Sequence, residues 1–445
     1  MSDPALLPRL IRLAGPVAIA RLGIMGMGVA DTIIVGQLAP RELSHLALGW
    51  APTGLFLVGA IGLLVSVQVL GARAIGEGRA AHAGAVLRRG LIIAWIAGGV
   101  SAALIALSAT PALLALGIKP DLAAAAGKVA MVLGLSIPLH LTFIAASFFM
   151  EAISRPNAGA VVMWLGNAVN IALNLVLVSA YGAVGSAWAT VGARVFLVAG
   201  LLGWIFLKLR DSGFGVAQPA PSSAPGFGAM LAVGAAAAIS QVAEAGAFGG
   251  MTVIAGRIGE DAVASYQIVL NLLAVVFMIA LGFAAATQVL VSESIGADQK
   301  AQATRAGWLG LGVNTLAMFA AAVLILLFAQ PIGRAFSADP ALVAAVAALM
   351  PIAALVLAPD GGQVVAAAAL RGRGDNWFPT ASHVFAYVIV MPPLAFLLGE
   401  MQGRGVAGLM EAIFIASCIS VGVLVARFAW LTRRAQGGFA QPRET

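Results

Sequence analysis

The chain has 445 residues, of which 61% are hydrophobic and only 10% are charged, and its formal net charge at pH 7 is +7. Soluble domains carry about a quarter charged residues, so this composition excludes an ordinary soluble protein and predicts an integral membrane protein. The single cysteine, Cys418, excludes an intrachain disulfide and a cysteine-based metal cluster.

Apolar segments recur along the whole chain, and each is long enough to cross a hydrocarbon core of about 30 Å as a helix. A transmembrane barrel is excluded, because its strands would be shorter and would alternate apolar and polar residues. The sequence therefore predicts an all-α integral membrane protein with twelve transmembrane helices. Their expected ranges are 10–36, 47–72, 90–110, 125–150, 158–180, 184–207, 229–255, 263–290, 306–329, 341–369, 378–398 and 406–431.

Basic residues are distributed unevenly over the expected loops. Of the 25 Lys and Arg residues, seventeen fall in the tails and in loops on the side of the N-terminus, and six fall on the other side. The remaining two, Arg21 and Arg194, lie inside spans. By the positive-inside rule, both termini are expected in the cytoplasm. The same distribution argues against a nucleic-acid-binding surface.

The two halves of the chain resemble each other. A shift of 220 positions aligns DTIIVGQL (31–38) with MTVIAGRI (251–258), and VQVLGARAIG (67–76) with TQVLVSESIG (287–296). Six spans per copy give both copies the same membrane orientation, so the two bundles are expected to be related by a pseudo-two-fold axis along the membrane normal. This plan favours a transporter, although channels and membrane enzymes can be duplicated as well. A later pair of aligned segments is GAVGSAWA (182–189) and GVAGLMEA (405–412).

A Pro-, Gly- and Ser-rich segment near the middle of the chain, DSGFGVAQPAPSSAPGFG, is expected to be a cytoplasmic linker. The predicted organisation follows from it. An N-terminal six-helix lobe covers 1–210, the linker covers 211–228, a C-terminal six-helix lobe covers 229–432, and a cytoplasmic tail covers 433–445. The expected architecture is two helical bundles that face a central cavity.

Acidic side chains lie inside the expected spans, where an ionised group at the centre of a membrane helix costs about 2.5–3.5 kcal/mol. From the helical rise, Glu244 lies roughly 20 Å from Arg257 at one membrane face, and Asp360 lies roughly 16 Å from Arg371 at the opposite face. Both carboxylates are therefore expected near the midplane. Asp31, in the first span, is the third such acid.

Two acids that share a cavity repel each other unless something positive lies between them. A coupling cation resolves the conflict, either as a proton or as Na⁺, which favours oxygen ligands. Glu244 and Asp360 are thus the candidate cation-coupling site, with Na⁺ as the candidate metal ion, and Asp31 is a further candidate. The alternative is that these acids form static pairs with Arg21 or Arg194, or hydrogen bonds between helices.

The acidic residues inside the expected spans have no acidic counterparts in the other half of the chain. By the offset of 220, Glu244 corresponds to Ile24. Near Asp360 the local offset is about 217, which places its counterpart close to Phe143. The two halves are therefore expected to carry different chemistry.

Amide side chains accompany the acids. Asn167, Asn170 and Asn174 share one helical face, and they either line a cavity near Asp31 or bond across helices. We take Asn170 and Asn174 as candidate cavity-lining and substrate-contacting residues. Asn167 shares their face and belongs to the same interpretation.

Two glutamines in the second half belong to the same group of candidates. Gln241 lies one turn before Glu244 and Gln363 one turn after Asp360, so each can hydrogen-bond its neighbouring acid. Both are candidate cavity-lining and substrate-contacting residues. Pro359, which is followed by Asp360 and two glycines, is expected to weaken the helix at that point.

Other polar features favour structural interpretations. Glu151 and Arg155, four residues apart, are typical of a surface pair at a helix end. His140 and His383 are interpreted as packing residues. The glycines of GIMGMGVAD (23–31) lie inside a span and indicate close helix packing rather than a nucleotide-binding loop. No Walker motif is present, which leaves an ion gradient as the energy source.

Three segments resemble the multidrug and toxic compound extrusion (MATE) family, and the duplicated layout extends this resemblance over essentially the whole chain. They are GVADTIIVGQLAPRELSHLALG (28–49), SRPNAGAVVMWLGNAVNIALNLVLVSAYGAVGSAWAT (154–190) and PDGGQVVAAAALRGRGDNWFPT (359–380). A glutamate in the seventh span and an aspartate in the tenth resemble the NorM-type branch.

The resemblance implies that Glu244 and Asp360 bind the coupling ion, and that Asp31 with Asn170 and Asn174 forms a polar site in the N-terminal lobe. It implies a multidrug efflux antiporter, not an enzyme. Such a protein exports amphipathic, often cationic organic compounds from the cytoplasm in exchange for Na⁺ or H⁺ by alternating access.

The expected setting follows from this function. We expect a multi-pass protein of the inner (cytoplasmic) membrane, acting as a monomer, with organic cations and the bilayer as partners and no cofactor besides the coupling ion. A lipid-linked precursor flippase of a related duplicated fold is the alternative, and it would line its cavity with several cations. An integral-membrane transferase is a third reading, and it would need a long polar catalytic loop.

Overall fold

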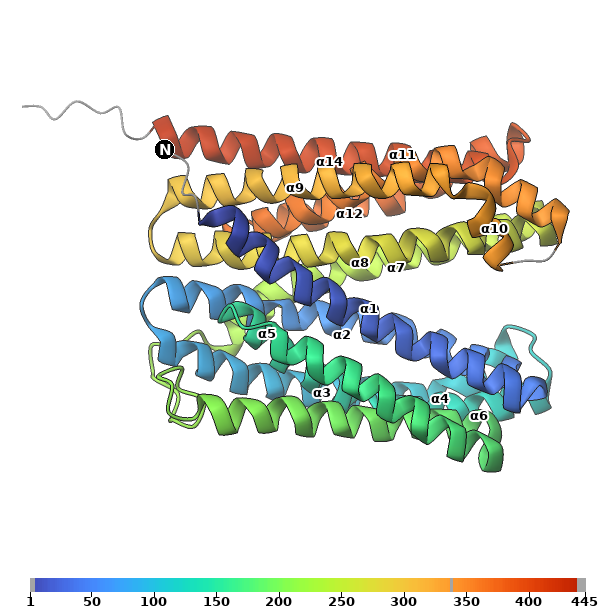
Figure 1. Ribbon diagram of the computed structural model, residues 1–445, viewed down its shortest axis with the longest axis horizontal. Coiled ribbons are helices and arrows are strands. Elements are labelled where there is room, and N and C mark those ends of the chain that lie inside the picture. The colour runs from blue at the N-terminus through green and yellow to red at the C-terminus, as the bar shows by residue number, and fades with distance from the viewer. Residues whose placement is uncertain (1–4, 337–338, 438–445) are drawn as a thin grey trace, which may run out of the picture. The chain divides into compact units, whose positions relative to one another are not determined.

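The computed structural model describes residues 5–336 and 339–437, and every regular element in this part of the chain is helical (Figure 1). Eleven of these helices are long and apolar enough to cross a membrane. One of the eleven, α6 (Asn157–Leu209), has 53 residues and joins two helices across a kink at Gly182. Counting its two parts separately gives the twelve expected spans. The expected tail lies outside the described residues from 438 onward.

The first half of the chain supplies six spans from seven helical elements. The expected span at 125–150 is divided at Ser136, where Pro138 cannot donate the helical hydrogen bond to the carbonyl oxygen four residues before it. Together the two parts still form one apolar span. The elements are α1 (Leu6–Leu38), η1 (Pro40–Glu42), α2 (Leu43–Gly76), α3 (Ala80–Ala115), α4 (Pro120–Leu135), α5 (Ile137–Ala152) and α6.

The second half repeats this order. Helix α11 runs unbroken past Pro359, which cannot donate a hydrogen bond to the preceding turn, so the expected weakening at this point stays a prediction. The irregular backbone lies in the eleventh span instead, which contains two π-helical turns. The elements are α7 (Phe227–Ile258), α8 (Glu260–Gly296), α9 (Lys300–Leu327), α10 (Ala329–Phe336), α11 (Pro340–Gly372), α12 (Trp377–His383), η2 (Val384–Val390), α13 (Met391–Ala395), η3 (Phe396–Met401) and α14 (Gly405–Gly437).

The helix boundaries determine the alignment of the two repeats more precisely than the sequence alone does. Helices α3 and α9, α4 and α11, and α6 and α12 each begin 220 positions apart. The left-handed residues Ser154 and Gly374 are also 220 apart, whereas Gly182 and Gly405 are 223 apart. The local offset near Asp360 is therefore 220 rather than 217. Its counterpart in the first half is His140, not a residue near Phe143.

By its internal contacts the chain forms two compact units. One unit is Ile19–Ala238, and the other contains the described residues before 19 and from 239 onward. The divisions thus fall inside α1, close to Pro16, and inside α7. The linker segment at 211–228 belongs wholly to the first unit.

Glycines at repeat-related positions allow close helix contacts within each unit. A Cβ atom on Gly62 of α2 would overlap the backbone of Ala238 in α7. A Cβ atom on Gly282 of α8 would overlap the carbonyl oxygen of Ala14 and the Cβ atom of Ala18 in α1. Small residues let membrane helices approach closely, and the gain comes from van der Waals packing. These contacts hold the first halves of α1 and of α7 against the neighbouring helices.

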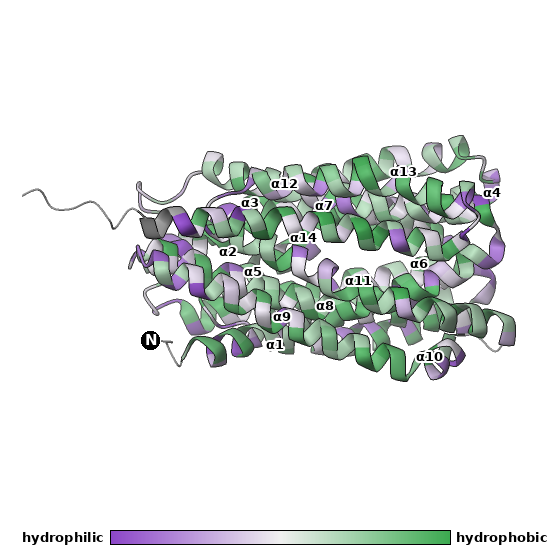
Figure 2. Cartoon of the chain, turned by 90° about the horizontal axis from the view of Figure 1, so that it is seen from above, coloured by the Kyte–Doolittle hydropathy of each residue, from purple (hydrophilic) through white to green (hydrophobic). Residues whose placement is uncertain are grey.

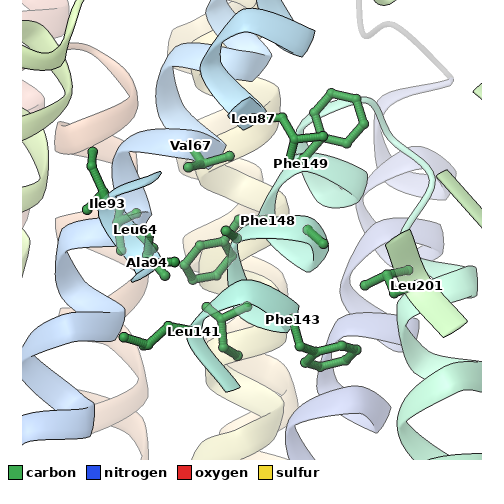
Figure 3. Close-up of a cluster of buried hydrophobic side chains, with 14 of the residues drawn as sticks. Leu64, Val67, Leu87, Ile93, Ala94, Leu141, Phe143, Phe148, Phe149 and Leu201 are labelled. Carbon is green, nitrogen blue, oxygen red and sulfur yellow. The ribbon is translucent and has the colours of Figure 1, made fainter. Parts of the chain in front are cut away.

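Apolar side chains fill the interior of each unit and also face outward along the helices. Figure 2 shows hydrophobic residues along the helices and hydrophilic residues concentrated at the helix ends. In the unit Ile19–Ala238, Leu64, Val67 and Leu87 pack with Phe148 and Phe149 in one buried cluster (Figure 3). In a bilayer such packing stabilises helix association through dispersion rather than through burial from water.

The linker between α6 and α7 is held against the end of α3. Arg88 Nη1 donates hydrogen bonds to the carbonyl oxygens of Gly215 and Val216 at 2.6 and 2.8 Å. Arg89 Nη1 donates to those of Ala224 and Pro225 at 3.2 and 2.5 Å. Hydrogen bonds from charged donors contribute about 1.5–3 kcal/mol each, so the linker is fixed rather than free.

Replacing Arg88 and Arg89 together by alanine is expected to release the linker and to speed chymotryptic cleavage after Phe214 about tenfold or more. The reason is that the open form becomes more populated once the charged hydrogen bonds are lost. Mass spectrometry of timed digests measures this rate. Arg79→Ala is the control, because that exposed arginine pairs with Glu77 and not with the linker. An unchanged rate in the double variant would contradict this account.

Candidate functional site

The acids Glu244 and Asp360 lie in the same unit, on α7 and α11, where the charge of Asp360 acts on the Glu244 carboxyl group. Gln363 Nε2 donates a hydrogen bond to Glu244 Oε1 at 3.1 Å. The hydroxyl groups of Tyr387 and Ser417 donate to Asp360 Oδ1 at 3.4 and 3.3 Å. Both acids thus accept hydrogen bonds from neutral groups, and a bound cation can replace these hydrogen bonds.

No arginine or lysine in the described part of the chain forms an ion pair with Glu244 or Asp360. The static pairs with Arg21 or Arg194 are therefore not formed by these two acids. Nor does the described chain contain a group of three or more His, Cys, Asp or Glu side chains that could hold a metal ion. Carboxylate and hydroxyl oxygens remain suitable ligands for Na⁺, so the coupling role of this pair stays a prediction.

A second polar layer lies one helical turn from Glu244. Ser240 Oγ is 2.6 Å from His383 Nδ1, and Arg371 Nη2 donates to Ser240 Oγ at 2.9 Å. Ser240 Oγ therefore accepts from Arg371 and shares a second hydrogen bond with His383 Nδ1, whose direction depends on the His383 tautomer. His383 Nδ1 also lies 3.9 Å from Glu244 Oε2. His383 therefore belongs to the acidic site, although the sequence suggested a packing residue.

Gln241 and Gln363 occupy different environments. The hydrogen bond to Glu244 comes from Gln363 of the neighbouring helix and not from Gln241, which lies one turn away on the same helix. Gln363 is fully buried and Gln241 is half-buried. A substrate contact by either residue stays a prediction.

Asp31 of α1 is fully buried in the unit Ile19–Ala238, and the structure brings it together with the predicted asparagines. Asn174 Nδ2 donates to Asp31 Oδ1 at 2.7 Å, and the Thr190 hydroxyl donates to Asp31 Oδ2 at 2.8 Å. Asn170 is fully buried one turn before Asn174, whereas Asn167 donates to the carbonyl oxygen of Gly23 at 3.0 Å. Each Asp31 oxygen therefore has a donor.

A cavity of about 540 Å³ lies within the same unit. Apolar and aromatic side chains form most of its wall, and its polar residues are Thr32, His140, Thr190 and Arg194. Asp31, Asn170 and Asn174 are not among its lining residues. Thr190, which the sequence did not single out, lies between Asp31 and the cavity because it contacts both. Its apolar wall includes Ile24, Met25, Met27, Trp50, Met163 and Leu197.

The arginine in the first span has a buried partner that the sequence did not suggest. Arg21 Nη2 lies 3.6 Å from Glu151 Oε1, and the guanidinium lies over the Phe148 ring. Gln68 Nε2 donates to the other oxygen of Glu151. The predicted surface pair of Glu151 and Arg155 was wrong: Glu151 is buried against α2 and α1, and Arg155 lies over Phe214.

Twelve apolar helices in two repeats, with two half-buried acids between helices of the second repeat, are typical of an integral membrane transporter built from a duplicated six-helix unit. A comparison with known families is specific: the MatE model matches residues 16–176 and 236–397, once in each half. The chain belongs to the MatE family. Members of this family are transporters and not enzymes.

Curated relatives cover nearly the whole chain. The chain is 40% identical over 435 residues to a probable multidrug resistance protein NorM of Caulobacter vibrioides, covering 96% of this chain and 92% of that protein. It is 31% identical to a probable multidrug resistance protein NorM of Deinococcus radiodurans, with 97% of each chain covered. These relatives agree with the NorM-type resemblance.

A solved structure shows the same fold. An outward-facing multidrug resistance MATE family transporter of the MOP superfamily has a TM-score of 0.89 and 20% sequence identity, and the similarity covers 97% of each chain. At this identity the likeness establishes the twelve-helix, two-lobe fold alone.

Proposed function

We propose that this protein is a multidrug efflux antiporter that exports amphipathic, cationic organic compounds from the cytoplasm in exchange for Na⁺ or H⁺. One observation carries the proposal: the half-buried acids Glu244 and Asp360 act on each other, accept hydrogen bonds from neutral groups, and form no ion pair with an arginine or lysine of the described chain. Relatives named as multidrug resistance proteins support the substrate class.

The exchange follows from competition for two negative charges. A cation loaded from outside lowers the affinity of the site for a cationic compound, and by linkage the compound lowers the affinity for the ion to the same extent. Alternating access of the two lobes, 1–210 and 229–432, then lets each guest leave on the opposite side of the membrane. Repulsion between Glu244 and Asp360 disfavours the unloaded state.

The setting is part of the same proposal. We place the protein in the inner (cytoplasmic) membrane with both termini in the cytoplasm, since basic residues concentrate on that side. It acts as a monomer with no cofactor besides the coupling ion. A lipid-linked precursor flippase is not favoured, because Arg194 is the only arginine or lysine that lines the described cavity and Arg21 is paired with Glu151.

The test is transport by the purified protein in liposomes that carry an imposed gradient of Na⁺ or of H⁺. A fluorescent organic cation is expected to move against its own gradient with one of the two ions, and an ionophore that dissipates that ion should stop the movement. Equal dye movement with either gradient and with none would overturn the antiport proposal.

A further inference from the structure

Arg371, near the end of α11, is buried close to the acidic pair without a carboxylate partner of its own. It is 6% exposed, whereas Glu244 and Asp360 are half-buried. It forms no ion pair with an Asp or Glu of the described chain. Its Nη2 donates to Ser240, and its Nε has no partner among the described residues. Buried charges in proteins are normally paired, so this one requires an explanation.

The repeat-related position in the first half carries a paired charge instead. The left-handed residues that follow the two helices are 220 positions apart, so Arg371 corresponds to Glu151. Glu151 is paired with Arg21. The boundaries of the two compact units inside α1 and α7 are also 220 apart, and by this offset Arg21 corresponds to the neutral Gln241. The second half therefore has a buried charge of opposite sign without the partner that the first half supplies.

Two side chains connect Arg371 to Glu244. Ser240, one turn before Glu244 on α7, accepts the hydrogen bond from Arg371 at 2.9 Å and lies 2.6 Å from His383 Nδ1. His383 Nδ1 in turn lies 3.9 Å from Glu244 Oε2. The charges of Arg371 and Glu244 act on each other across this layer. The acid that balances Arg371 is thus one of the two acids of the proposed cation site.

With both acids ionised, the acidic site therefore carries one net negative charge rather than two. Arginine keeps its proton in proteins, so the charge of Arg371 is permanent. His383 adds no charge, because burial and the nearby guanidinium both disfavour an imidazolium. The groups that donate to the acids are the neutral amide of Gln363 and the hydroxyl groups of Tyr387 and Ser417. One monovalent cation neutralises this site, whereas a negative charge would remain beside the cation if Arg371 were absent.

The position and strength of this charge suit the release of a cation. Ser240 precedes Glu244 on α7, and Arg371 is the last residue but one of α11, so the layer lies toward the helix ends that the proposed function places in the cytoplasm. Two unit charges about 8 Å apart, at an effective dielectric constant of about 20, interact strongly enough to change a binding constant about thirtyfold. A guanidinium roughly one helical turn from Glu244 therefore opposes cation binding by about tenfold or more.

We propose that Arg371 is an affinity-determining residue of the cation site, which weakens the binding of the coupling cation to Glu244 and Asp360 so that the cation is released toward the cytoplasm. The inference rests on the proposed antiport function and adds to it a residue that contacts neither guest. Arg371 acts through its charge and through Ser240, which it holds. Without this charge the site binds its cation tightly and releases it slowly.

The test measures cation binding to the purified full-length protein in detergent. The two probes are radioactive Na⁺, followed by scintillation proximity, and a monocationic dye, followed by fluorescence polarisation. Arg371→Gln is expected to bind both cations about tenfold or more tightly than the wild type, because a positive charge beside the acids is lost. An uncharged analogue of the dye should bind within about twofold of the wild type. Arg371→Lys keeps the charge and should bind both cations within about threefold of the wild type.

Transport separates this role from a purely structural one. The assay uses liposomes with a gradient of Na⁺ or of H⁺, whichever drives dye efflux by the wild type. In Arg371→Gln the ion concentration that gives half the maximal rate is expected to fall about tenfold. The maximal rate is expected to fall as well, by about tenfold, because the ion leaves slowly. Damage to the packing of α7 and α11 would lower the rate without tightening the binding of the ion.

Arg373→Gln is the matched control. Arg373 lies two residues further along, where it donates to Thr304 and lies over the Phe428 ring, so both cation affinities should stay within about twofold of the wild type. Thermal unfolding followed by circular dichroism shows which variants are folded. If Arg371→Gln fails to fold, Ser240→Asp takes its place. It adds a carboxylate beside Arg371, gives the site the same net charge, and should tighten the binding of both cations in the same way.

The outcomes distinguish the two proposals. Unchanged or weaker binding of both cations in a folded variant would overturn the inference, and so would equal tightening in Arg373→Gln or of the uncharged dye. Tighter cation binding in Arg371→Gln, together with no gradient-driven transport by the wild type, would refute the antiport proposal and leave the role of Arg371 standing. Gradient-driven transport with unaltered cation affinities in Arg371→Gln would do the reverse.

Discussion

Replacing Glu244 by glutamine, or Asp360 by asparagine, is expected to lower gradient-driven efflux of an organic cation by about a hundredfold. Each change removes a negative charge and keeps the shape of the side chain. A carboxylate–cation interaction of about 3 kcal/mol, comparable to the penalty for an ionised group in the bilayer, corresponds to that factor. Initial rates in liposomes with an imposed ion gradient measure the effect.

Two controls make this result specific. Glu260→Gln changes an exposed acid at the start of α8 and should leave the rate unchanged. In Glu244→Gln the new amide oxygen still accepts the hydrogen bond from Gln363, so loss of folding is not expected. Wild-type rates of gradient-driven efflux in both variants would refute the coupling role of the two acids.

Glu151→Leu is expected to destabilise the protein by about 3 kcal/mol, because it leaves Arg21, whose side chain is only 15% exposed, without its partner. The double variant with Arg21→Met removes the stranded charge and should recover most of that loss. Unfolding in a denaturing detergent, followed by circular dichroism, gives the two free energies.

The matched control is Arg155, which lies four residues after Glu151. Arg155→Met removes a guanidinium that lies over Phe214 and forms no ion pair in the described chain, so a change below about 1 kcal/mol is expected. A Glu151→Leu variant as stable as the wild type would mean that the Arg21–Glu151 contact does not hold the first unit together.

The lengths of the apolar segments and the internal repeat were enough to predict the transmembrane spans, because both follow directly from the order of residues along the chain. Helical rise also placed Glu244 and Asp360 at similar depth, and the structure brings their charges together. Depth along a helix does not give rotation about its axis. The contacts of His383 with Ser240, and of Glu151 with Arg21, depend on how neighbouring helices face each other.

The cavity of the first unit was missed for the same reason. Trp50, His140 and Arg194 come from three different helices and share no sequence pattern. A signal was nevertheless present: at the offset of 220, His140 stands where the second half has Asp360. The drifting offset assumed for that region hid the correspondence, and the helix boundaries restored it.

The chain passes between its two compact units only in the middle of α1 and in the middle of α7, with no loop at either point. A helix is a stiff rod, and sharp bends in it arise at proline or where its hydrogen bonds are disturbed. Pro16 offers α1 such a joint, whereas α7 contains no proline. Any rocking of one unit therefore acts as a lever on α7, where Ser240 and Glu244 follow the crossing within two turns. In the proposed transport cycle, Glu244 therefore lies within two turns of the point where α7 would have to bend.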